Sequence, residues 1–63
     1  MEIAKLKKII SKKTFQDYLE IQYEGNFNLF TEADYVAEML GISLDDYFLI
    51  INNYNKLKTA YNL

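Results

Sequence analysis

Apolar residues recur at helical spacing along the whole chain, and no stretch shows the alternation of a strand. The pattern predicts four helical segments, at residues 2–12, 15–24, 32–40 and 44–60. Nothing at residues 11–13 forces a break, so the first two segments are also compatible with one bent helix. We therefore expect an all-α fold: a compact bundle of three main helices plus an N-terminal helical segment, forming a single domain over residues 1–63.

The last predicted helix is apolar on almost every side between Tyr47 and Ile51. A helix that is hydrophobic all round should be buried. The stretch therefore indicates either a central core helix, packed by the other segments, or a helix that is partly covered by a partner.

Side chains that stop or start helices mark the ends of these segments. Three predicted starts have a hydroxyl residue followed three positions later by aspartate: Thr14 and Asp17, Thr31 and Asp34, Ser43 and Asp46. Such a hydroxyl can accept a hydrogen bond from an early backbone N–H, and the carboxylate suits the positive end of the helix dipole. Apolar residues before two of the starts predict staples that pair Phe30 with Tyr35 and Ile42 with Tyr47. Gly25 and Gly41 are predicted to end the helices before them.

The stretch from Tyr35 to Ile51 resembles a helix-turn-helix in its spacing, because Gly41 and Ser43 separate two apolar helices. A helix that reads the major groove needs donors for base edges and cations for phosphates. The second helix begins with Asp45 and Asp46 instead. We therefore expect a helix-turn-helix-like hairpin that packs two helices rather than one that reads DNA.

Composition narrows the chemistry. The chain has 63 residues, no histidine, no cysteine and no arginine. These absences remove most acid–base pairs, nucleophiles and zinc sites, and there is no glycine-rich phosphate loop. The carboxylates Asp17, Glu20 and Glu24 form a stripe along one helix and do not converge on a metal. We predict a protein that is not an enzyme and that needs no cofactor or metal.

The charges are strongly segregated along the chain. Residues 1–13 have five lysines and one glutamate, residues 14–55 have eight acidic residues and no lysine, and residues 56–63 add two lysines. No apolar run is long enough for a membrane span, and the N-terminus does not have the pattern of a signal peptide. We expect a cytoplasmic protein, in a bacterium or a phage-infected host cell, that does not bind membranes.

Aromatic residues favour a protein partner. Six tyrosines are more than so small a core accommodates easily, and tyrosine is enriched at protein interfaces. The predicted partner-binding residues are the exposed members of an aromatic set, with two glutamates at its rim: Tyr18, Tyr23, Phe27, Tyr54, Tyr61, Glu20 and Glu24.

Two alternatives remain open at this point. One is a helix-turn-helix-like transcriptional regulator, although a nucleic-acid partner is not the expected one; its phosphate contacts would be Lys5, Lys7, Lys8, Lys12, Lys13, Lys56 and Lys58. The other is a structural homodimer that buries the strip from Tyr47 to Ile51 across a two-fold axis.

A run of residues also suggests a family. The stretch Gly25-Asn-Phe-Asn-Leu-Phe30, followed by Tyr35, Gly41 and the apolar residues 47–51, resembles small uncharacterised phage and prophage proteins of Gram-positive bacteria. In that family a helix ends in Gly-x-x-Asn, an apolar pair follows, and two more helices come after. The resemblance implies a short accessory protein of phage type, and it implies no particular site residues. The size, the acidic centre and the aromatic content of the chain suit an accessory protein that docks on a host factor and modulates it.

Overall fold

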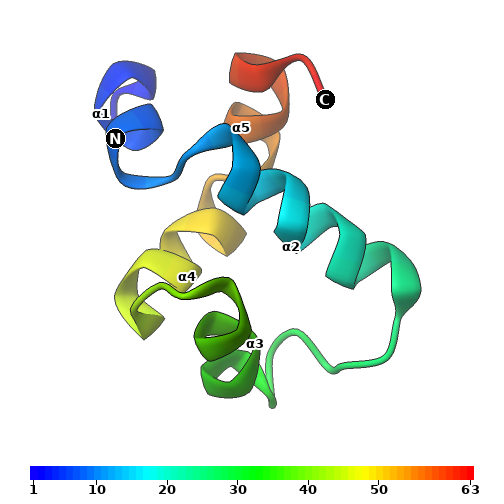
Figure 1. Cartoon of the computed structure of the whole chain (residues 1–63). Helices are drawn as coiled ribbons and strands as arrows, with labels where there is room; N and C mark the ends of the chain where they lie inside the picture. The colour runs from blue at the N-terminus through cyan, green and yellow to red at the C-terminus, as the bar shows by residue number, and fades with distance from the viewer.

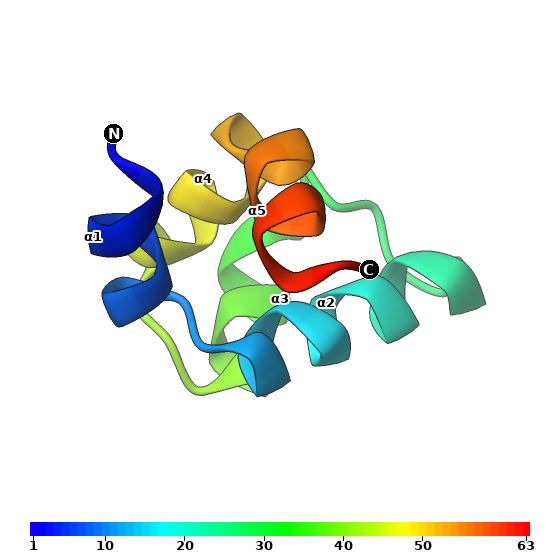
Figure 2. The same cartoon turned by 90° about the horizontal axis from the view of Figure 1, so that it is seen from above.

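The fold consists of helices only. The structure, a computed structural model, describes all 63 residues. It contains five helices: α1 (Ile3–Ile9), α2 (Lys12–Glu24), α3 (Ala33–Leu40), α4 (Leu44–Asn52) and α5 (Tyr54–Tyr61). They form one compact bundle of 29 × 21 × 17 Å, so the all-α prediction is confirmed (Figures 1 and 2). The longest helix has 13 residues, and none is long and apolar enough to cross a bilayer.

The two ends of the chain meet in the bundle. Helix α5 packs against α1 and α4, while α3 packs against α4 and α2. In Figure 1, α1 and α5 lie at the top of the molecule and α3 lies at the bottom. The segment that links α2 to α3 runs from the far end of α2 down to α3 (Figure 1). The N-terminal and C-terminal helices are therefore neighbours, although they are far apart in sequence.

One hydrophobic core joins all five helices. It consists of ten buried residues: Leu6, Ile10, Phe15, Tyr18, Ala33, Val36, Ala37, Tyr47, Ile50 and Leu57. The ring of Tyr18 lies 6.2 Å from that of Phe15 and 5.9 Å from that of Tyr47, so three aromatic side chains form its centre. No buried side-chain nitrogen or oxygen lacks a hydrogen-bond partner. Aromatic packing thus gives a small chain without disulfides a filled core.

The helix starts agree with the sequence at one position and differ at two. The Ser43 hydroxyl oxygen accepts from the backbone N–H of Asp46 at 3.1 Å, as predicted. Helix α2 begins earlier than expected, because Ser11 rather than Thr14 is its cap and accepts from the N–H of Thr14 at 3.1 Å. Helix α1 ends before this cap, at Ile9, and Ile10 is extended with φ of −111°, so α1 and α2 are two separate helices.

The turn before α3 differs from the predicted Thr31 cap. Asn28 Oδ1 accepts from the backbone N–H of Thr31 at 3.0 Å, and Glu32 Oε1 accepts from the N–H of Asn28 at 2.9 Å. These reciprocal bonds close a turn over residues 28–32, ahead of α3. The N-cap of α3 is Glu32, which makes no side-chain capping bond, so the predicted Thr31 cap is wrong.

Both glycines end helices as predicted, but the last predicted helix is interrupted. Gly25 and Gly41 adopt left-handed conformations with φ of 69° and 72°. The prediction of one helix over residues 44–60 is wrong, because the chain leaves helical geometry at Asn53, where φ is −123°. The side-chain amide of Asn53 donates to the carbonyl of Leu49 at 2.9 Å and so binds the end of α4. The break allows α5 to turn back onto α1.

Candidate interaction surfaces

The structure divides the predicted partner-binding tyrosines into buried and exposed groups. Tyr18 has only 3% of its surface exposed and lies in the core, so it is not available to a partner. Tyr54 and Tyr61 are half-buried, and their hydroxyls donate within the molecule. The partner atoms are Gln22 Oε1 at 3.0 Å for Tyr54 and the Ile10 carbonyl at 2.6 Å for Tyr61. These three tyrosines therefore hold the bundle together.

Burial also changes the acidity of tyrosines. Burial, which desolvates the hydroxyl, raises the pKa of Tyr47 to about 12, and the nearby Tyr18 contributes less to the same increase. Desolvation raises the pKa of Tyr18, with a further contribution from Tyr54, and it raises that of Tyr61. Each of these hydroxyls is therefore held in its neutral form, in which it can donate a hydrogen bond.

Four aromatic residues lie along the chain from the end of α2 to the start of α3, and two of them are stacked. Phe27 stacks on Tyr35 with ring centroids 5.4 Å apart and an interplanar angle of 27°. Tyr35 remains 56% exposed, Tyr23 is 92% exposed, and Phe30 is also exposed. We call Tyr23, Phe27, Phe30 and Tyr35 the aromatic corner. Tyr23 and Phe27 are the two members of this corner that the sequence predicted as partner-binding residues.

Tyr35 and Phe30 were not expected at this surface, because the sequence paired them in a staple. Phe30 is largely in solvent, and Tyr35 stacks on Phe27 instead. A signal for the position of Tyr35 was present: it lies off the helix face formed by Val36, Ala37 and Leu40. A helical residue away from the apolar face is exposed, so Tyr35 was the better candidate for a contact residue.

Negative charge lies on the two helices that flank the aromatic corner in sequence. Glu20 and Glu24 are exposed on α2, and Asp34 and Glu38 are exposed on α3. There is no lysine between residues 14 and 55. Although acidic residues are numerous, no three side chains of metal-ligating type come together. The corner therefore combines aromatic area with an acidic border, and it suits a partner with apolar and basic groups.

The predicted phosphate-binding lysines are brought closer together by the packing of α1 on α5. Several of them have intramolecular partners. Lys7 Nζ lies 5.4 Å from the ring centroid of Tyr61, and Lys58 Nζ lies 5.7 Å from that of Tyr54. Lys13 pairs with Asp17 at 3.1 Å, and Lys56 donates to the Met1 carbonyl at 3.4 Å. Lys5, Lys8 and Lys12 are exposed without such a contact.

The hairpin of α3 and α4 has the expected turn. The N–H of Gly41 donates to the carbonyl of Glu38, the N–H of Ile42 donates to that of Ala37, and Ser43 then caps α4. Asp45 is exposed in the first turn of α4, and Asp46 is half-buried beside it. The start of the second helix therefore presents negative charge, which repels a phosphate backbone.

The strip at residues 47–51, which the alternative homodimer would bury, is largely covered by the chain itself. Tyr47 and Ile50 have no exposed surface, and Leu49 and Ile51 are half-buried. Within this strip only Phe48, at 40% exposure, faces solvent. The all-round apolar pattern therefore indicates a central core helix.

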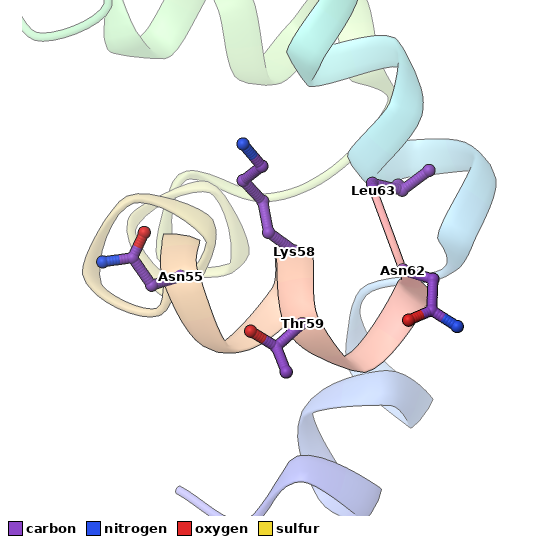
Figure 3. Close-up of a pocket in the computed structure, with 5 residues that line it drawn as sticks. All are labelled: Asn55, Lys58, Thr59, Asn62 and Leu63. Atoms are coloured by element: carbon purple, nitrogen blue, oxygen red, sulfur yellow. The ribbon is translucent and has the colours of Figure 1, made fainter.

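A shallow hollow lies along α5 and has mixed polar lining. Its five residues are Asn55, Lys58, Thr59, Asn62 and Leu63. Figure 3 shows that these side chains spread in different directions around the helix and do not point to a common centre. No set of convergent donors or acceptors is present, so we assign no ligand to this hollow.

The chain was compared with known proteins. No family model matches it, and no curated protein or solved structure matches it. The resemblance to phage proteins therefore stays a prediction.

Proposed function

We propose that this chain is a small non-enzymatic accessory protein that acts by binding another protein through the aromatic corner. The stacked and half-exposed pair of Phe27 and Tyr35 carries this proposal. An aromatic pair that is already fixed in the free protein loses little conformational freedom when a partner covers it. Interface hot spots are enriched in such side chains.

The acidic border defines the chemistry of the partner. Its four carboxylates are exposed on α2 and α3, the helices before and after Phe27 and Phe30, and have no lysine nearby in sequence: Glu20, Glu24, Asp34 and Glu38. A partner segment with apolar side chains and lysine or arginine would match both features. A host protein modulated by a phage-encoded chain in the cytoplasm fits the size and the sequence resemblance.

A pull-down from the lysate of a Gram-positive bacterium tests the proposal. We expect one protein to bind the tagged chain in stoichiometric amount, with or without nuclease. Replacement of Tyr23 and Tyr35 by alanine should remove it, because both rings are exposed and contribute little to the core. Phe48→Ala is the matched control, since it removes an exposed aromatic ring from α4, outside the corner.

Two outcomes would contradict the proposal. Binding that survives the loss of Tyr23 and Tyr35 would exclude the aromatic corner as the contact surface. Binding that disappears with nuclease would instead support the nucleic-acid alternative, in which Lys5, Lys8 and Lys12 contact phosphates and the affinity falls steeply with salt.

A further inference from the structure

The molecule has a positive end and a negative end. All seven lysines lie on α1, on the first turn of α2 and on α5, which packs against α1. Eight of the nine acidic residues lie between Asp17 and Asp46, on the rest of α2, on α3 with its preceding turn, and at the start of α4. The net charge is only −2. Two copies therefore repel each other weakly overall, while the opposite ends attract.

One side of the molecule displays both charges. Figures 1 and 2 both show α1 and the start of α4 on the same side, at the left of each view. The end of α2, the helix that carries Tyr23, lies at the opposite side in Figure 1. The side formed by α1 and the start of α4 is therefore separate from this part of the proposed partner surface.

Helical spacing directs complementary groups outward from these two helices. On α1, Leu6 and Ile10 are buried, so Lys5 and Lys8 point away from the core. On α4, burial of Tyr47 and Ile50 leaves three residues facing outward: Leu44, Asp45 and Phe48. Ile3 on α1 is also exposed, at 46%. Each helix therefore offers apolar area, with positive charge on α1 and negative charge on α4.

We propose that a second copy of this chain covers this side, with α1 of each copy on the start of α4 of the other. A two-fold axis makes both contacts at once and closes the assembly as a dimer. Specific interfaces bury about 800 Å² per partner. The exposed surface of the chain is 4282 Å², so one side of the molecule provides enough area. Charge complementarity sets the pairing, and Ile3, Leu44 and Phe48 add apolar contacts.

Charge reversal tests this pairing by sedimentation equilibrium. The unmodified chain should form a dimer at low salt and dissociate as sodium chloride is added. Lys5→Glu with Lys8→Glu in one chain, and Asp45→Lys in another, should each weaken the dimer at least about tenfold, since like charges then face each other. An equimolar mixture of the two variants should restore a one-to-one dimer, because both reciprocal contacts regain opposite charges.

Controls separate the dimer from general charge effects and from misfolding. Glu20→Lys with Glu24→Lys changes charge at the far end of the molecule and should leave the dimer intact. Phe48→Ala should weaken the dimer without any change in charge, and circular dichroism checks the helix content of each variant. In the pull-down, this substitution should leave the heterologous partner bound, so the two proposals can fail separately.

Several results would overturn the inference. The chain could be a monomer at every concentration and salt, or a dimer that neither salt, charge reversal nor Phe48→Ala affects. A mixture of folded reversal variants that stays monomeric would exclude the pairing of α1 with α4. Species larger than a dimer would exclude the two-fold arrangement.

Discussion

Tyr47 links the core to the candidate surface. Its side chain has no exposed area, and its hydroxyl donates to the Leu29 carbonyl at 2.8 Å. Leu29 lies in the segment between α2 and α3, which also carries Phe27 and Phe30. A core tyrosine on α4 therefore fixes the backbone on which half of the aromatic corner is built.

Tyr47→Phe should lower the free energy of unfolding by about 1 kcal/mol near neutral pH, because the partly buried Leu29 carbonyl loses its donor. It should also change the response to alkali. Because burial raises the pKa of Tyr47 to about 12, its neutral form stabilises the fold fully below pH ~10, and this stability is lost as pH rises to 12. Urea unfolding between pH 8 and 12 should show a smaller loss in the variant. An identical loss in both proteins would assign the effect to Tyr18 and Tyr61.

At the scale of helices, local signals were readable and long-range ones were not. Ser43 and Gly41 act through neighbouring backbone groups, so the sequence predicted the end of α3 and the start of α4. Two hydroxyls, Ser11 and Thr14, stand three residues apart, and the helix begins at the first of them, which the local pattern alone did not select. No glycine or proline in the sequence marks the break at Asn53. The break accompanies the packing of α5 against α1, a tertiary contact that local propensity does not report.

Gly41→Ala tests whether the backbone conformation of this residue stabilises the end of α3. Gly41 has φ of 72°, where a Cβ is unfavourable, although a Cβ there would meet no atom within 4 Å. We expect a loss of about 1 kcal/mol for alanine and a smaller loss for Gly41→Asn, since asparagine tolerates this conformation better. Chemical denaturation of both variants measures the difference. A larger loss for asparagine would show that space, rather than backbone conformation, governs the position.

The charge layout of the whole molecule was visible in the sequence, whereas the exposure of single tyrosines was not. The lysines lie near the two termini of the sequence, and the acidic residues lie between them. Because α5 packs on α1, the lysines form one end of the folded molecule and the acidic residues form the other. Tyr18 and Tyr23 have the same chemistry and share one helix, yet one is 3% and the other 92% exposed. The sequence predicted both as partner-binding residues. Only the course of the chain after Gly25 leaves Tyr23 beyond the last helix that could cover it.

The stability of the whole bundle depends on very few residues, because ten side chains form its core. A domain of 63 residues has a free energy of unfolding of roughly 3–9 kcal/mol at the usual values per residue. Ile50→Ala leaves a cavity among the fully buried side chains of α4 and should cost about 2–5 kcal/mol, a large part of that total. Ile3→Ala is the matched control, since the same chemical change at a 46% exposed position should cost less than about 1 kcal/mol. Urea midpoints in dilute solution compare the two. Equal losses would mean that α1 and α4 contribute alike to the core, contrary to the burial of Ile50 and the exposure of Ile3.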